Sequence, residues 1–285
     1  MPYVTTPPQP VHFQPSPIDV RRSGHRQIDT DLGELDLIRC DHLSGEYVEK
    51  QKLDETGTLL VYPDFKLTAE ETQNGRVEFD GLRGRLLGVH AHERNEHVLD
   101  KHTAKLKDDP KYSEIHFVFE IIKDELSLVE PYKEDVAAAA NGVKEPSGLM
   151  VVGALLKLPR DLKPKAPATF GTIAGMPSGQ SQPVDFSRVV EWIEEKDRYV
   201  YDGSLTSPNY SEAVRWVLCA KAIDDVTVAE GLRDFLRLCA QPARAAKPLG
   251  RRFLLRTPGN GTKPAAPPVA KTTPRGKNKG KGKNA

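Results

Sequence analysis

Five of the eight histidines in this chain lie between residues 90 and 116. Two of them, His90 and His92, are one residue apart in a run that predicts a β-strand. Residues i and i+2 of a strand project from the same face, so both imidazoles can approach one point, about 6–7 Å apart along the strand. His116 lies in a second alternating run, and an adjacent antiparallel strand would bring it opposite the pair. Three neutral imidazoles with an open fourth position are typical of a catalytic zinc site.

A His-x-His pair on a strand is not specific to metal binding. Such histidines are often exposed to solvent or hydrogen-bonded in a core, and His97 and His102 lie nearby in the sequence. Glu114 favours the metal interpretation, because it precedes His116 by two residues and shares its face. There its carboxylate can accept the second imidazole N–H and fix the tautomer of the ring. The spacing alone therefore leaves both interpretations open: zinc ligation by His90, His92 and His116 with Glu114 behind His116, or histidines that are exposed or hydrogen-bonded in a core.

The surrounding runs predict a β-rich body that positions these side chains. Glu114–Ile121 and Gly148–Leu156 are almost unbroken apolar runs, as expected of central strands buried on both faces, and Arg85–Ala91 is predicted beside them. A long loop is predicted between Asp161 and Pro183. Further strands are predicted at Leu35–Ile38, Thr58–Tyr62, Arg76–Phe79, Tyr199–Tyr201, Ala213–Ala220 and Phe253–Leu255, and helices at Val184–Lys196 and Val226–Cys239.

The charge of the chain is balanced overall but uneven along its length. The 41 Lys and Arg against 40 Asp and Glu give a formal net charge of +1. Residues 257–285 contain basic residues and no acid, together with Pro, Gly, Ala and Asn, and this composition predicts a disordered basic tail. The Pro-rich residues 1–17 predict an extended arm on the surface. Residues 18–256 remain as a single domain.

Composition also limits the class and location of the protein. The mean hydropathy is −0.51, and no apolar run reaches the ~18 residues that a membrane helix needs. The three cysteines form no Cys-x-x-Cys motif, which excludes the usual structural zinc and redox patterns. Residues 1–17 lack the layout of a secretory signal. We therefore expect a soluble protein of the cytoplasm or another intracellular compartment.

Several segments resemble the alpha-carbonic anhydrase family, in the same order along the chain from Pro15 to Leu255. Residues 16–19 (SPID) are similar to the start of the family's domain. Residues 90–97 and 114–116 resemble the His-x-His-x-x-x-Glu-His and Glu-x-His segments of bacterial and plant members with short loops. Residues 148–153 resemble its Gly-Leu-Ala-Val-Leu-Gly strand. The most specific likeness is residues 201–216, which resemble Tyr-x-Gly-Ser-Leu-Thr-Thr-Pro followed by Ser-Glu-x-Val-x-Trp.

The resemblance implies a mainly β domain, built on a twisted and mostly antiparallel sheet of about ten strands. It also implies Zn2+ as the cofactor, and reversible hydration of carbon dioxide to bicarbonate and a proton by attack of zinc-bound hydroxide. Thr206 would accept a hydrogen bond from that hydroxide and donate its own to Glu96. The apolar wall of the substrate pocket would consist of Val118, Val151, Leu205, Val214 and Trp216.

Some positions depart from the family's pattern. Gly88 stands where a glutamine usually orients the first ligand, which predicts weaker zinc binding. Arg76 stands where the proton-shuttle histidine is common, and arginine does not release a proton near neutral pH. We therefore expect proton transfer to limit turnover, with the shuttle group unknown. Tyr210 replaces a disulfide cysteine of secreted members, and the segment around Leu106–Tyr112 is lengthened.

Two other functions stay open at this stage. A carbonic anhydrase-like module that acts in binding or as a scaffold would keep the fold without catalysis, but retention of all three histidines favours the enzyme. The basic tail could hold a polyanion weakly and without sequence specificity, by counterion release. No specific nucleic acid and no membrane span are expected as partners, and the sequence does not indicate an oligomeric state.

Overall fold

The structure is a computed structural model that describes residues 16–23, 26–53, 59–104, 112–122, 148–162, 180–206, 214–238, 240–241, 243–250 and 252–262. Its larger sheet has ten strands in the described part of the chain. Nine follow the order β1-β13-β10-β11-β8-β7-β6-β5-β2, and β12 pairs with β6. These strands are β1 (Gln27–Asp29), β2 (Asp36–Ile38), β5 (Arg76–Phe79), β6 (Leu82–His92), β7 (Tyr112–Ile121), β8 (Leu149–Lys157), β10 (Arg198–Gly203), β11 (Val214–Cys219), β12 (Ala240–Gln241) and β13 (Leu254–Thr257).

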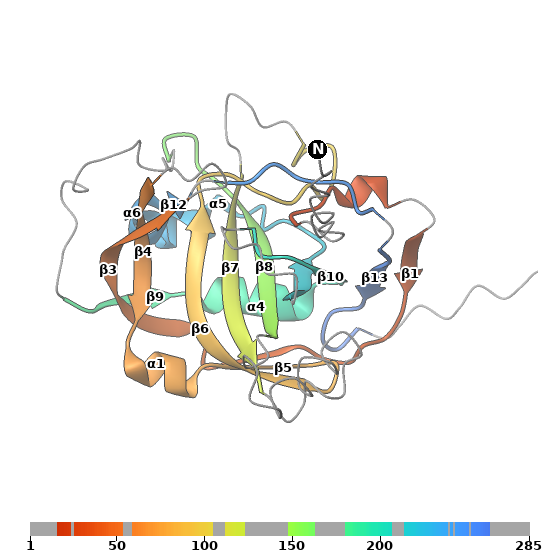
Figure 1. The fold of residues 1–285 in the computed structure, drawn as a ribbon, viewed down its shortest axis with the longest axis horizontal. Helices are drawn as coiled ribbons and strands as arrows, with labels where there is room; N and C mark the ends of the chain where they lie inside the picture. Colours follow the sequence, from red (N-terminus) through yellow and green to blue (C-terminus); the bar gives the residue numbers. More distant parts are fainter. Residues whose placement is uncertain are drawn as a thin grey trace, which may run out of the picture.

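A smaller sheet and several short helices cover the larger sheet. The smaller sheet has the order β4-β3-β9 and is antiparallel throughout. Figure 1 shows β3 and β4 beside β6, with α4 behind the central strands. The bounds are β3 (His42–Leu53), β4 (Leu59–Leu67), β9 (Gln182–Asp185), the 3-10 helix η1 (Val20–Arg22), α1 (Ala69–Asn74), α4 (Ser187–Glu195), α5 (Val226–Gly231) and α6 (Arg233–Leu238).

The predicted mainly β fold with a twisted, mostly antiparallel sheet is confirmed. Three pairs in the larger sheet are parallel: β1 with β13, β8 with β11, and β6 with β12. The strands β6, β7 and β8 lie side by side at its centre (Figure 1) and pair antiparallel. Alternate side chains of these strands therefore enter two different layers, one on each face of the sheet.

The two layers have different compositions. One is the main apolar core, where Phe117 and Phe119 of β7 pack with Phe186 and the buried side of α4. The other is a smaller apolar cluster around Val151, Trp216 and Leu218. Glu114 and His116 are buried on this second face, alternating along β7 with the core residues. The second face is therefore the one that carries polar chemistry.

A β-bulge in β6 decides which face its histidines occupy. Leu86 pairs with Phe119 and Gly88 pairs with Val118, so Leu87 is an additional residue without a partner in the register. Before the bulge the even-numbered Leu82 and Leu86 enter the main core, and after it the odd-numbered Val89 and Ala91 do. Such an insertion moves every later side chain to the other face. Without it, His90 and His92 would point into the main core.

The structure differs from the predicted elements where contacts distant in sequence decide the conformation. The helix predicted at Val226–Cys239 is two helices, because the chain leaves helical geometry at Leu232 between α5 and α6. The helix predicted at Val184–Lys196 begins only at Ser187, since residues 182–185 pair with β3 as β9. The strands β1 and β3 and the helix α1 were not predicted. Most of the loop predicted at 161–183 lies outside the described residues.

Described residues just outside both predicted domain boundaries pack against the domain. Ser16, assigned to a surface arm, is completely buried. Thr257 is also completely buried, and the Asn260 side chain bonds to the backbone of Leu35. These contacts could not be predicted because their partners are more than two hundred residues away. Residues 1–15 and 263–285, the rest of the predicted arm and tail, lie outside the described residues, as does Tyr210.

No helix in the described part of the chain is long and apolar enough to cross a membrane. The thiols of Cys40 and Cys219 are both buried and free. Burial raises the pKa of the Cys40 thiol to about 12 and that of the Cys219 thiol to about 11. Neither thiol is therefore a reactive thiolate near neutral pH.

Candidate metal centre

The strand register brings the three predicted ligands together. His90 on β6 lies directly across from His116 on β7, and His92 lies across from Glu114. The Nδ1 atom of His116 is 3.3 Å from the Nε2 atom of His92 and 3.3 Å from the Nε2 atom of His90. The three rings meet edge to face at centroid separations of 5.1, 5.1 and 4.8 Å. Each imidazole thus presents one nitrogen toward a common point.

The spacing of these nitrogens fits a tetrahedral metal ion. Zinc binds imidazole nitrogen at about 2.0–2.1 Å, and tetrahedral geometry then separates two ligand nitrogens by about 3.3–3.4 Å. Hydrogen bonds between the rings account for the spacing less well. The single lone pair on His116 Nδ1 can serve one linear hydrogen bond, whereas this atom lies equally close to two neighbouring rings. These histidines therefore fit a bound zinc ion.

Glu114 fixes the tautomer that ligation by His116 requires. The Nε2 atom of His116 is 2.9 Å from Glu114 Oε1 and donates its proton there, which leaves Nδ1 unprotonated. Burial lowers the pKa of His116 despite this carboxylate, so the ring is neutral. Burial would raise the pKa of Glu114, but its contacts with His97 and His116, which hydrogen-bond to it, hold that pKa well below its usual range. Glu114 is thus an ionised acceptor directly behind the neutral His116 ring.

Glu96 and Thr206 meet beside the histidines. Glu96 is buried, and its Oε1 atom accepts the backbone N–H of Arg244 at 2.7 Å. Burial raises the pKa of Glu96 to about 7, against the lowering effects of His116, the Arg244 N–H and a hydrogen bond from the Thr206 side chain. The Oε2 atom of Glu96 is buried and has no hydrogen-bond partner among the described residues. The orphaned Oε2 lies 3.3 Å from His92 Nε2, so it faces the ligand nitrogens.

An apolar wall stands next to the ligands, as the resemblance implied. Trp216 on β11 lies 5.0 Å from His116 between ring centroids and donates its indole N–H to the Ser204 carbonyl at 2.9 Å. The five predicted wall residues form one cluster on the face of the sheet that bears the histidines. Val151, Val214 and Trp216 are buried in it, and the partly buried Val118 and Leu205 pack against it.

The structure does not place the remaining predicted positions in the metal centre. Gly88 precedes His90 on the same face, and a Cβ atom there would meet nothing within 4 Å. Arg76 begins β5 opposite Arg85, and its guanidinium donates to the Gly75 carbonyl at 2.8 Å. His102 is exposed in a turn where its backbone N–H bonds to Asp100. His102 is therefore not a ligand here.

The sequence did not indicate which side chains hydrogen-bond to Glu114 and pack behind the three histidines. His97 shares the Glu114 carboxylate, with its Nδ1 atom 2.5 Å from Oε1, and its Nε2 atom is 2.7 Å from the Tyr201 hydroxyl. The His97 ring also packs on Trp216, with 4.8 Å between the centroids. The available signal was the Glu96-His97 pair inside the histidine-rich stretch, but its partners lie on other strands.

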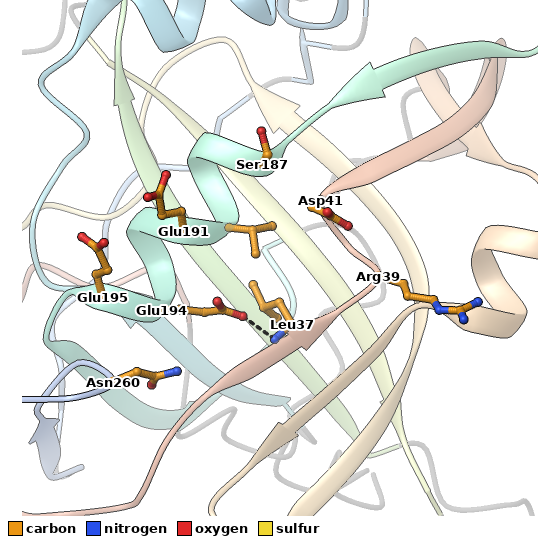
Figure 2. Close-up of a pocket in the computed structure, with 9 residues that line it drawn as sticks. Leu37, Arg39, Asp41, Ser187, Glu191, Glu194, Glu195 and Asn260 are labelled. Carbon is orange, nitrogen blue, oxygen red and sulfur yellow. Dashed lines mark hydrogen bonds between the residues drawn. The ribbon is translucent and has the colours of Figure 1, made fainter.

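A hollow of about 610 Å3 lies elsewhere, on the α4 side of the sheet, between α4 and the segment before β3. Figure 2 shows Glu194 on α4 pointing toward Leu37 and bonded to its N–H, while Glu191 and Glu195 point away from Leu37. Four acids against one arginine make this hollow unfavourable for an anion such as bicarbonate. No predicted site residue lines it.

Comparisons with known proteins identify the family of the chain. The sequence model for eukaryotic-type carbonic anhydrases matches residues 11–246. An alpha-carbonic anhydrase structure from Photobacterium profundum is 21% identical, with 86% of this chain and 90% of that chain covered and a TM-score of 0.48. One from Thermovibrio ammonificans, in complex with the inhibitor sulfanilamide, is 21% identical, with 86% and 88% covered and a TM-score of 0.49. No curated protein sequence matches the chain.

Proposed function

The chain belongs to the eukaryotic-type carbonic anhydrase family, and we propose that it catalyses the reversible hydration of carbon dioxide to bicarbonate and a proton. His90, His92 and His116 would hold a zinc ion. The observation that carries the proposal is the convergence of three ring nitrogens, with His116 Nδ1 3.3 Å from a nitrogen of each of the other two rings, beside a carboxylate oxygen without a hydrogen-bond partner and an apolar wall. This combination would provide a binding site for a metal ion, a hydrogen-bond relay and an apolar surface for an uncharged substrate.

Bound zinc would supply a water molecule whose pKa falls toward 7, and so a nucleophile at neutral pH. The residues of the chain orient that nucleophile. Glu96 would accept a hydrogen bond from the Thr206 hydroxyl, which leaves the Thr206 oxygen free to accept a hydrogen bond from the attacking oxygen and aim the lone pair of that oxygen at the substrate. The wall around Val151, Val214 and Trp216 excludes water from the side where carbon dioxide would bind.

The decisive experiment measures metal and activity in the same preparation. We expect about one zinc per chain by elemental analysis, as a site of three imidazoles predicts. Stopped-flow hydration of carbon dioxide should be present in that protein, absent after chelation and restored by zinc. A zinc-reconstituted protein without hydration activity would reject the enzyme and leave the binding or scaffold module as its function.

Two variants test the choice of ligands. His116→Ala should lose zinc and reduce hydration by at least about a thousandfold, because only two ligands remain. The matched control is His102→Ala, which removes an exposed imidazole outside the metal centre. Zinc loss in His102→Ala, or zinc retained in His116→Ala, would show that the ligand set is wrong.

A further inference from the structure

Ser16 is a completely buried residue that bonds to the segment carrying Thr206. Its backbone N–H donates to Ser204 Oγ at 3.1 Å, and its own Oγ accepts the Ser204 N–H at 3.1 Å. The two serines therefore hold each other through a reciprocal pair of hydrogen bonds. The backbone of Gly203 packs against the same hydroxyl so closely that a Cβ atom at Gly203 would clash with it. The backbone at Ser204, two residues before Thr206, is thus held in place.

A second path leads from Ser16 to a metal ligand. The Tyr201 hydroxyl lies 3.2 Å from Ser16 Oγ and 2.7 Å from His97 Nε2. The other nitrogen of His97 bonds to Glu114, whose carboxylate accepts the His116 N–H. All five side chains are buried. In such surroundings a continuous chain of hydrogen bonds is stiffer and stronger than its separate members.

A third path leads from Ser16 to Glu96. Arg244 donates from Nη1 to the Ser16 carbonyl at 2.9 Å, and its backbone N–H donates to Glu96 Oε1 at 2.7 Å. The same arginine thus holds both the serine and the carboxylate of the proposed relay. Ser16 is therefore two hydrogen bonds from Glu96 through Arg244, four from His116 through Tyr201, and bonded to Ser204 two residues before Thr206.

We propose that Ser16 is a positioning residue for carbon dioxide hydration, which keeps Thr206, Glu96 and His116 in one mutual geometry. This inference rests on the proposed function, but its physical content is the coupling of the three groups through one buried residue. Catalytic groups need placement to within about 0.5 Å, and an error of about 1 Å can cost about a hundredfold in rate. Loss of the Ser16 hydroxyl would remove its bonds to the Ser204 N–H and to Tyr201. The residue whose carbonyl accepts from Arg244 would then be held less firmly, and no group that touches substrate would be removed.

The test compares Ser16→Ala with Thr257→Val in the zinc-loaded full chain. Thr257 is a matched control, because its completely buried hydroxyl also accepts a backbone N–H from a distant segment, that of Leu32, but on β13. Both variants should melt at lower temperature. Only Ser16→Ala should lower kcat/KM, by about tenfold, shift the pH midpoint of kcat/KM and weaken the binding of sulfanilamide.

A second variant covers the case in which Ser16→Ala does not fold. Tyr201→Phe keeps the aromatic stack on Trp216 and removes only the hydroxyl between Ser16 and His97. It should shift the pH midpoint in the same direction as Ser16→Ala, with a smaller loss of kcat/KM because the Ser204 pair remains. Unchanged pH midpoints and unchanged sulfanilamide affinity in the folded variants would reduce Ser16 to a stabilising residue and overturn the proposal.

Hydrogen exchange in the metal-free protein separates this proposal from the proposed function. The backbone amides of Glu96 and His97 donate to Glu114, and that of Arg244 donates to Glu96. All three should exchange about tenfold faster in Ser16→Ala and at the wild-type rate in Thr257→Val. If the wild type hydrates no carbon dioxide, the proposed function fails, and these exchange rates still decide whether Ser16 couples the groups. Equal exchange in wild type and Ser16→Ala would reject the coupling.

Discussion

The histidine cluster of β6 and β7 and a second cluster around Arg198 are both buried, but their polar groups are used differently. The guanidinium of Arg198 donates to the Pro258 carbonyl at 2.6 Å and to Asn260 Oδ1 at 3.0 Å. Asn260 in turn exchanges two hydrogen bonds with the backbone of Leu35, at 2.9 and 2.8 Å. Both guanidinium Nη atoms here face acceptors, while the buried Arg198 Nε has no hydrogen-bond partner in the described part of the chain. The cluster joins the C-terminal segment to the chain near β2.

In the histidine cluster, three ring nitrogens approach one another instead. The Nδ1 atom of His116 has two neighbouring ring nitrogens at the same distance of 3.3 Å, and Glu96 Oε2 has no partner of full geometry. A buried polar group without a good partner costs stability, whereas a fully bonded one contributes to it. The comparison indicates that the Arg198 cluster stabilises the fold, and that the histidine cluster stays costly until a ligand satisfies it.

The largest expected change in stability comes from Arg198→Met, which replaces a buried donor with an apolar side chain of similar length. The carbonyl of Pro258 and the Asn260 side chain would lose their donor, so we expect a loss of about 3 kcal/mol in the free energy of unfolding. Zinc affinity should stay unchanged, because no bond of Arg198 leads to the ligands. Urea unfolding and a zinc titration measure the two quantities.

The corresponding substitution in the histidine cluster is His90→Leu, measured in the metal-free protein. Since this substitution relieves the convergence of ring nitrogens, the free energy of unfolding should change by less than about 1 kcal/mol, or rise, while zinc affinity collapses. If His90→Leu destabilised the metal-free protein as much as Arg198→Met, the two clusters would not differ in the way described.

The next effect concerns pH. Burial raises the pKa of Glu96 to about 7, so between about pH 4.5 and 7 the folded metal-free protein holds a proton that the unfolded chain has lost. The free energy of unfolding should therefore fall as pH rises through this window, by at most about 3 kcal/mol relative to Glu96→Gln, which cannot ionise. Urea unfolding of both proteins at several pH values gives the difference. Parallel curves would mean that Glu96 ionises normally.

A smaller effect is expected from Gly88→Gln. A Cβ atom at position 88 meets nothing within 4 Å, so the longer side chain has space beside His90. An amide that orients the first ligand should tighten zinc binding about tenfold. Gly88→Leu is the control, because it fills the same space without a polar group. If Gly88→Gln and Gly88→Leu bound zinc equally well, any gain in affinity would come from packing and not from the amide.

The smallest effect concerns proton transfer. An imidazole titrates near neutral pH and a guanidinium does not, so Arg76→His should raise kcat a few-fold in dilute buffer and leave kcat/KM for carbon dioxide unchanged. Arg76→Gln removes the charge without adding an imidazole and should leave kcat unaltered. A wild-type kcat that does not respond to imidazole buffer would show that another group already carries the proton.

Local patterns predicted that three histidines would meet, because the information needed is local. The alternation around His116 and the i, i+2 spacing of His90 and His92 are properties of single strands, and the register places His90 directly across from His116. The predicted place of Glu114 followed from the same rule. The apolar runs at Glu114–Ile121 and Gly148–Leu156 predicted the central strands for the same reason, since both of their faces are buried.

The supporting side chains could not be predicted, because their bonds join distant segments. Ser16 contacts residues near position 204, and Asn260 bonds to Leu35. The periodicity of a sequence does not indicate which distant residues form hydrogen bonds with each other. The bulge in β6 was also missed, although the adjacent Leu86 and Leu87 interrupt the alternation of that strand. A pair of neighbouring apolar residues is too common in strands to indicate a bulge alone.

Because of the bulge, the position of the histidines depends more on the number of residues in β6 than on which residue stands at position 87. Leu87 is exposed, so most substitutions there should leave the fold and the ligands in place. Deleting the same residue would restore strict alternation and turn His90 and His92 into the apolar layer. Over evolutionary time, substitutions at this position should therefore be common and single-residue deletions eliminated, a contrast that a residue's exposure alone would not suggest.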